Sequence, residues 1–421
     1  MSSPKFKRQL REITEVDGNH VRLGGRWLLN LASNNYLGLA NHPAVQAAAI
    51  AALERWGTGS GSSPLLSGFT SAHQEFLQTM VGWKTGGLDL AAGDVVDRAA
   101  ATTRSASPGI RALLFPSGYS ANLAALTTLI EPNAQVFADR KNHASLVDGL
   151  RLASAERTAL TIRYFRHRDF SDLARLLESS DPRRPRWIVT DSVFSMDGTC
   201  TRPSDLGDLV ARFDARLLVD EAHATGVIGT CGAGLFSLNQ ANSEPGLWRD
   251  QQPRFAVVGT LSKALASVGG YFVGPTEWAE QMLQAARPLI YSTSLPASCV
   301  AAATAAIHVS LTGAWRRRSL HENIVLLHSE LSEQGWRTVG DPEAPLLAVV
   351  VGDHRAAEQL ADALLELGVW APAIRPPTVK PFECRIRLSP TATMTADEIR
   401  TVITAFGSLT QFNGRGGSDG P

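Results

Sequence analysis

The sequence predicts an α/β protein whose larger domain has a mainly parallel sheet flanked by helices, followed by a smaller C-terminal α/β domain. Two observations support this prediction. Short apolar runs end in polar or glycine residues, and helix-like stretches separate them. The runs of the larger domain are Ala112–Phe115, Trp187–Val189, Leu217–Val219 and Phe255–Val258. The second pattern begins after about residue 288, with strands at 346–351 and 384–388, a helix at 354–367, and a Thr395/Glu398 capping box before the last helix.

We therefore expect four parts in the chain. They are an N-terminal arm (1–45), a large domain (46–287), a small domain (288–412) and a disordered Gly-rich tail (413–421). Within the large domain, residues 84–110 are rich in Ala, Gly, Thr and Ser without clear periodicity. This composition predicts an inserted loop.

Composition narrows the range of partners. The chain has 421 residues, is 44% hydrophobic, and has 40 Lys plus Arg against 40 Asp plus Glu. A balanced charge offers no field for nucleic acid or an anionic membrane, so we expect small-molecule substrates. The four scattered cysteines lack the spacings of a metal site or a disulfide framework, which favours a reducing compartment. Without a signal-like or membrane-spanning apolar run, the expected location is the cytoplasm.

The segment 115–122 joins a predicted strand to an apolar helix. Backbone N–H groups near Gly118 and Tyr119 would point at an anion above the helix N-terminus, as in a phosphate site. On this segment alone, an ordinary turn that uses glycine for its dihedrals is the better interpretation.

Asp220 lies at the tip of an apolar strand, and His223 follows three residues later. The sequence Asp-Glu-Ala-His also occurs in Walker-B helicase boxes, but the Gly-Lys-Ser/Thr phosphate loop of such proteins is absent, and 82–85 lacks the glycine before its lysine. Alternatively, the Asp220 carboxylate keeps a pyridinium nitrogen protonated and so makes the ring an electron sink. A merely capping aspartate is an equally good interpretation of this segment by itself.

Lys263 follows another apolar strand, among the small residues of 259–270. A single lysine is usually a solvated charge, but a crowded lysine can titrate low and act as a nucleophile. Phosphate turn, strand-tip acid and lysine occur in order, each at a strand end, where open α/β sheets bind ligands. This order favours pyridoxal 5'-phosphate held as a Schiff base on Lys263. The Gly-rich stretch 57–63 has the wrong spacing for a dinucleotide fingerprint.

With these residues in place, the chain resembles the α-oxoamine synthases, fold-type I pyridoxal-phosphate transferases that condense an amino acid with an acyl thioester. The resemblance runs from about Phe6 to Phe412 and implies a seven-stranded, mainly parallel sheet. Its motifs are Ala32–Gly38, Asn142–Leu146, Val193–Gly198, Asp220–His223 and the Lys263 segment. The segments 289–294 and 374–379 match the branch that condenses L-alanine with pimeloyl-CoA, or with a pimeloyl carrier protein, in biotin synthesis.

The resemblance also implies the cofactor site. Lys263 would form the Schiff base and later remove the α-proton, Asp220 would pair with the pyridine nitrogen, and His143 would stack on the ring. The remaining contacts would come from Ser195 and His223 at the phenolic oxygen, and from Thr260, Gly118 and Tyr119 at the phosphate.

The implied substrate site uses residues from both ends of the chain. Asn34 and Arg387 would hold the amino-acid carboxylate, which suits a two-pronged guanidinium. Thr378 would line the acyl side, His143 could polarise the thioester carbonyl, and Arg8 would supply an acyl-site arginine, with Lys7 and Arg11 as alternative alignments. Taken singly, His143 is more often a helix cap or a core histidine, Arg387 more often a surface ion pair and Thr378 a turn residue.

The resulting hypothesis is an acyltransferase that performs a decarboxylative condensation as a homodimer, with Ser292–Ser294 near the partner's phosphate. Three alternatives use the same chemistry: glycine with acetyl-CoA, serine with a long acyl chain, and an acyl donor of secondary metabolism. A catalytically silent binding or regulatory protein is the alternative from another class, and an ATPase without a phosphate loop is the weakest.

Overall fold

The computed structural model describes residues 10–88, 109–155, 157–238, 244–249 and 252–413. Its centre is a seven-stranded sheet of order β4-β12-β11-β8-β7-β5-β6, in which β12 runs antiparallel to both neighbours and the remaining pairs are parallel. The bounds are β4 Ile110–Phe115, β5 Gln135–Asp139, β6 Thr161–Phe165, β7 Arg186–Asp191, β8 Arg216–Asp220, β11 Phe255–Thr260 and β12 Gly270–Pro275. The predicted mainly parallel sheet is confirmed.

Helices cover both faces of this sheet because its strands are apolar on both sides. Along β8, Leu217 and Val219 join one buried cluster and Leu218 joins the other, as the two-residue period of a strand requires. One face carries α3 Gly118–Leu129, α4 Ala144–Ala155, α7 Thr276–Ala285 and α8 Arg287–Ile290. The other carries α2 Ser71–Thr85, α5 Phe170–Glu178, α6 Pro203–Arg212 and α9 Ala297–Thr312.

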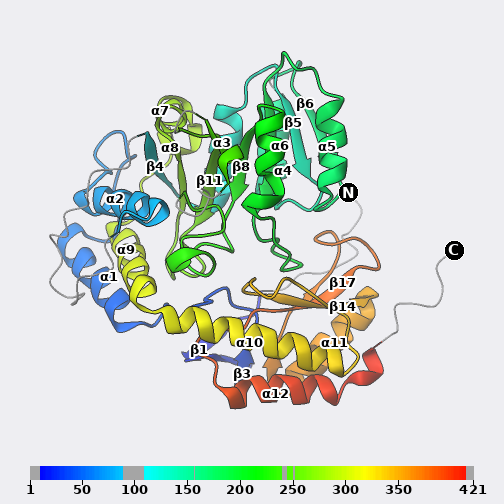
Figure 1. The fold of residues 1–421 in the computed structure, drawn as a ribbon. Helices are drawn as coiled ribbons and strands as arrows, with labels where there is room; N and C mark the ends of the chain where they lie inside the picture. Colours follow the sequence, from blue (N-terminus) through cyan, green and yellow to red (C-terminus); the bar gives the residue numbers. More distant parts are fainter. Residues whose placement is uncertain (1–9, 89–108, 156, 239–243, 250–251, 414–421) are drawn as a thin grey trace, which may run out of the picture.

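The N-terminal strands and the C-terminal elements lie together below this sheet (Figure 1). The N-terminal strands β1 Ile13–Asp17, β2 His20–Leu23 and β3 Arg26–Asn30 form a sheet with β15 Val369–Trp370, which pairs parallel to β3. A second small sheet contains β13 Thr338–Val339, β14 Leu347–Gly352, β17 Cys384–Leu388 and β16 Ala373–Ile374. The strand pairing between β3 and β15 brings the segment that follows β3 close to β17.

The remaining elements complete this lower part. They are α1 Pro43–Trp56, α10 Ala314–Glu333, α11 His354–Glu366 and α12 Ala396–Gly407. A short hairpin of β9 Trp248–Arg249 and β10 Gln252–Pro253 precedes β11 and contacts β12 of the large sheet. The predicted capping box starts α12, since Glu398 N–H donates to Thr395 Oγ1 at 3.2 Å and Thr395 N–H to Glu398 Oε2 at 2.7 Å. The helix α9 packs against α1 and α2. The division into domains stays a prediction.

The predicted loop 84–110 is shorter than expected at both ends. Lys84 and Thr85 form the last turn of α2, and Ile110 begins β4. The helix continues through Lys84 because its ammonium group has buried partners, which composition alone could not indicate. Residues 89–108 of the predicted loop and 414–421 of the predicted tail lie outside the described residues.

Within the described ranges, no single helix is both long enough and apolar enough to cross a membrane. The pair α9 and α10 meets that criterion jointly, by length and composition, but is bent by 79° between its members.

Candidate active site

The candidate site lies at the carboxyl ends of the central strands. Asp220 ends β8, Thr260 ends β11, and Ser117 and Gly118 join β4 to α3. These ends are adjacent because β8 pairs in parallel with β11, with Asp220 opposite Val258. The sheet therefore brings together three of the segments that the sequence predicts to be functional.

The turn between β4 and α3 is closely packed against the end of β11. A Cβ on Gly118 would lie 3.1 Å from Thr260 Cβ, and one on Gly270 only 2.2 Å from the Ser117 carbonyl oxygen. Ser117 Oγ caps α3 by accepting from Ser120 N–H at 3.1 Å. Tyr119 is partly exposed and its hydroxyl donates to Asp148, so the predicted phosphate role involves its backbone. Small residues thus let the turn pack against β11 and β12, and the first turn of α3 has the backbone N–H groups that can bind a phosphate.

The Asp220 carboxylate is buried and held by two donors. Asn122 Nδ2 donates to Oδ2 at 2.6 Å, and Ala222 N–H donates to Oδ1 at 2.8 Å. Asn122 Nδ2 also lies 2.9 Å from Ser145 Oγ, which in turn lies 2.7 Å from His143 Nδ1. The sequence reasoning missed Asn122 as a functional residue, although a polar amide on the otherwise apolar helix α3 was a signal for it.

His143 precedes α4 and is both a cap and a site residue. Its N–H donates to Asp191 Oδ2 at 2.8 Å, and its Nδ1 accepts from Ser145 N–H at 3.3 Å. Burial lowers the pKa of the imidazole, Asp220 opposes this shift, and the charge of Lys263 adds to it. His143 is therefore neutral near pH 7.

Lys263 follows β11 in a site that disfavours its charged form. Burial lowers the pKa of its ammonium group to about 8, with the Arg387 charge contributing, although Asp220 raises it. Among the described residues, no hydrogen bond or ion pair holds its Nζ. The uncharged fraction of Lys263 near neutral pH is thus much larger than that of an ordinary lysine, as a nucleophile requires.

A second cluster joins the N-terminal segment to β17. His223 Nδ1 lies 2.7 Å from the Tyr36 hydroxyl, which donates to Asn34 Oδ1 at 3.1 Å. Arg387 also donates to Asn34 Oδ1. Burial, with the Lys263 and Arg387 charges, holds the pKa of His223 well below its usual value, and burial raises that of Tyr36 to about 12. The sequence reasoning missed Tyr36, although the Ala32–Gly38 motif contains it.

Two predicted residues, Ser195 and Thr378, have no polar side-chain contact with these clusters in the part of the chain that the structure describes. Ser195 is half-buried in the loop after β7, and Thr378 is exposed, with its N–H donating to the Arg375 carbonyl at 3.1 Å. Arg8 lies outside the described residues.

The residues present fit pyridoxal phosphate. They combine a fixed carboxylate, a lysine with a lowered pKa and a neutral imidazole around one strand edge. Two buried polar atoms, Asn122 Oδ1 and Arg387 Nε, have no partner within the described structure and remain available to a bound molecule. The described residues contain no His, Cys, Asp or Glu group suited to a metal ion.

Comparison with known proteins supports the same class of site. Residues 26–406 match the family described as aminotransferase class I and II. An 8-amino-7-oxononanoate synthase of Nitrosococcus oceani is 37% identical to this chain over 91% of the chain and 92% of the relative. Another, from Polaromonas naphthalenivorans, is 38% identical over 90% of this chain and 87% of the relative. A serine palmitoyltransferase from S. paucimobilis, solved with a PLP–myriocin aldimine, superposes with a TM-score of 0.83 at 28% identity, covering 96% of this chain and 93% of that one.

Proposed function

Because the chain belongs to the aminotransferase class I and II family, we propose that it is a pyridoxal-phosphate-dependent acyltransferase of biotin biosynthesis. It condenses L-alanine with a pimeloyl thioester to give 8-amino-7-oxononanoate, carbon dioxide and a free thiol. Its 37–38% identity to named 8-amino-7-oxononanoate synthases exceeds the 28% shared with the serine palmitoyltransferase. The observation that carries the chemistry is a half-buried Lys263 with a lowered pKa, which the oriented carboxylate of Asp220 influences.

Pyridoxal phosphate, when bound, supplies an electron sink for the bonds broken at the amino-acid α-carbon. Asp220, fixed by Asn122, would face the pyridine nitrogen and stabilise its proton. Lys263 would hold the cofactor and then, as a neutral amine, take the α-proton, since its pKa of about 8 suits proton transfer near neutral pH. His143, neutral for the reasons above, would cover the ring face and donate toward the thioester carbonyl.

Other residues would bind and orient the reactants. Thr260 and the backbone at Gly118 and Tyr119 would hold the phosphate, and Ser195 and His223 the phenolic oxygen. Arg387 and Asn34 would bind the amino-acid carboxylate, which later leaves as carbon dioxide; their mutual hydrogen bond already aligns them. Thr378 and Arg8 remain proposals for the acyl side.

We further propose that the enzyme is a cytoplasmic homodimer. Leu65, Leu66, Phe69 and Tyr291 have exposed apolar side chains, and Leu65 and Phe69 line a cavity of about 460 Å³ together with Ser292–Ser294. A second copy that covers these side chains would bring Ser292–Ser294 toward the other subunit's phosphate site. A cytoplasmic location suits a coenzyme A thioester substrate.

Thiol release by the cofactor-loaded enzyme across a matrix of amino acids and acyl thioesters tests this function. We expect the highest turnover with L-alanine and pimeloyl-CoA, or with a pimeloyl carrier protein in its place. Best turnover with glycine and acetyl-CoA, or with serine and palmitoyl-CoA, would assign the chain to another α-oxoamine synthase. If every pair fails, a non-catalytic binding protein becomes the better interpretation.

A further inference from the structure

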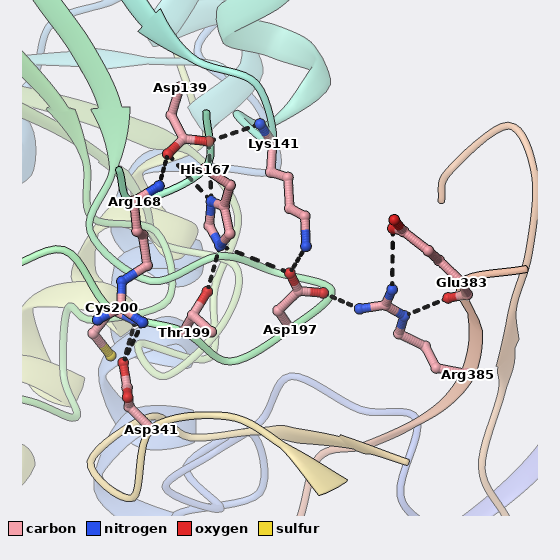
Figure 2. Close-up of polar contacts among 10 residues, drawn as sticks. All are labelled: Asp139, Lys141, His167, Arg168, Asp197, Thr199, Cys200, Asp341, Glu383 and Arg385. Carbon is pink, nitrogen blue, oxygen red and sulfur yellow. Dashed lines mark hydrogen bonds and ion pairs between the residues drawn. The ribbon is translucent and has the colours of Figure 1, made fainter. Parts of the chain in front are cut away.

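A buried carboxylate outside the cofactor contacts, Asp197, joins three separate parts of the fold (Figure 2). It lies in the loop between β7 and α6, two residues after Ser195. Its Oδ2 lies 2.6 Å from the Lys141 ammonium, and its Oδ1 accepts from the guanidinium of Arg385. Figure 2 shows Asp197 between these two cations, one from the large sheet and one from β17.

The Arg385 contact connects Asp197 to the substrate site, because Arg385 and Arg387 both belong to β17. Arg385 and Arg387 are two residues apart in this strand, so their side chains leave the same face of the small sheet. Arg385 is buried, and its other partners are the Glu383 carbonyl at 2.8 Å and the Glu383 carboxylate at 3.6 Å, both from its own segment. Asp197 is therefore its partner from the large-sheet side, and it anchors the strand that presents Arg387.

The Lys141 contact connects Asp197 to His143, the histidine that is proposed to cover the ring. Lys141 lies two residues before His143, and its N–H donates to Asp139 Oδ1 at 2.8 Å at the end of β5. The Asp139 carboxylate also binds His167 Nδ1 at 3.0 Å, and His167 Nε2 lies 3.1 Å from Thr199 in the Asp197 loop. The loops that present Ser195 and His143 are thus held together by the same group of residues.

The backbone of the Asp197 loop is also fixed against the small sheet. Gly198 has φ of +68°, and a Cβ there would lie 2.3 Å from the Leu346 carbonyl oxygen. Asp341 N–H donates to the Gly198 carbonyl at 2.8 Å, and Cys200 N–H donates to Asp341 Oδ2 at 2.6 Å. The close contact gives Asp197 a defined position from which to orient both cations.

We propose that Asp197 is a positioning residue for substrate binding: through Arg385 it sets the place of Arg387, and through Lys141 that of His143. This inference rests on the proposed function only in that an amino-acid carboxylate is the ligand of Arg387. Its effect is therefore on binding and alignment of the amino acid, and it requires no particular acyl donor.

Asp197→Asn tests the proposal because it keeps the shape of the side chain and removes its charge. With the cofactor-loaded protein, the change in visible absorbance on adding L-alanine, glycine or serine measures amino-acid affinity without acyl thioester. We expect the dissociation constant of the best-bound amino acid to rise about tenfold to a hundredfold, with cofactor retained, because a misplacement of about 1 Å has effects of this size. An unchanged affinity would overturn the proposal.

The matched control is Glu343→Gln, which removes the 2.7 Å ion pair between Glu343 and Arg202. This pair also joins the large sheet's side to the small sheet, between the start of α6 and the β13–β14 segment, but it does not involve β17. We expect its amino-acid affinity to stay at the wild-type level. The double variant Asp197→Asn/Arg385→Gln should bind the amino acid no more weakly than the poorer single variant, because the two residues act as one unit. Fully additive losses would contradict action through Arg385.

A measurement on the cofactor-free protein separates positioning from general instability. In Asp197→Asn, amide hydrogen exchange should accelerate in β17 and in residues 194–198, while β11 keeps its wild-type protection. Acceleration spread uniformly over the chain would indicate a purely structural role and overturn the proposal. Failure of the proposed function has a different signature, since wild type would then bind an amino acid but release no thiol from pimeloyl thioesters.

Discussion

Lys84 is fully buried and Lys263 is half-buried, and the two lysines have opposite electrostatic environments. Lys84, from α2, lies 2.7 Å from Glu221 and also donates to the Ala233 carbonyl at 2.6 Å and to Thr225 Oγ1 at 3.1 Å. Burial by itself lowers the pKa of Lys84, but Glu221 and Tyr271 together outweigh that effect and the pKa is raised. Burial without such a partner lowers the pKa of Lys263 to about 8.

The two acids near these lysines, Glu221 and Asp220, are neighbours in the chain but also have different partners. Glu221 is satisfied by Lys84 and by the Phe236 N–H at 2.6 Å. Asp220 is oriented by neutral amide donors, and none of the lysines that the structure describes lies within hydrogen-bonding distance of it. A buried ion pair makes a lysine chemically inert, while burial beside a carboxylate that is not bonded to it leaves a reactive amine. This contrast separates a structural lysine from a catalytic one.

Replacing Lys263 with methionine should give the largest effect and the clearest test of the contrast. Thiol release should fall by at least about 10³-fold, since the proton-transfer group is lost, and the visible absorbance of the covalently held cofactor should be absent. At pH 7 the cofactor-free variant should melt at a higher temperature than wild type, because an unfavourable buried amine is removed. Retained covalent absorbance would contradict the assignment of Lys263.

Replacing Lys84 with methionine should have the opposite effect on stability. It leaves the Glu221 carboxylate buried without its cation, so the free energy of unfolding should fall by about 3–5 kcal/mol. Urea denaturation measures this change, and the folded fraction should still attach the cofactor to Lys263. The double variant Lys84→Met/Glu221→Gln serves as control and should recover much of the loss; a tolerated single variant would show that the pair has little structural weight.

The pH dependence of cofactor attachment gives a smaller effect that sharpens the comparison. Only the neutral amine forms the bond, so the initial rate of attachment to cofactor-free protein should rise with pH through about 8 rather than through the ordinary lysine value of 10.5. Arg387→Met removes a charge that lowers the Lys263 pKa, so its curve should move to higher pH. Identical curves for the two proteins would contradict electrostatic coupling between Arg387 and Lys263.

The lowered pKa of Lys263 also determines how this residue's contribution to the stability of the fold changes with pH. An unfolded lysine binds a proton below about 10.4, whereas folded Lys263 does so only below about 8. The unfolded state therefore binds more protons between these values, and the contribution of Lys263 to stability rises with pH across that window. Below pH 8 the penalty is complete, which is why the gain in the Lys263→Met variant is expected at pH 7 and should vanish near pH 11.

Most of the cofactor side of the site could be predicted from local sequence. Asp220 and Lys263 each follow an apolar run, and parallel strands align their carboxyl ends at one edge, so pattern alone placed both residues together. Asn122 was missed because its partner, Asp220, lies 98 positions away in the chain. The extent of α2 was misjudged for the same reason, since Glu221, 137 positions from Lys84, satisfies the lysine that ends the helix.

The sequence by itself determined the sheet, the strand-end positions of Asp220 and Lys263, and the chemistry that those residue types can perform, because these depend on local periodicity. Only the tertiary structure decided which lysine is paired and which is reactive, and how Asn34, 353 positions from Arg387, meets it beside His223. The reason is physical: burial and charge neighbours shift a pKa, and both arise from contacts between segments that are distant in sequence.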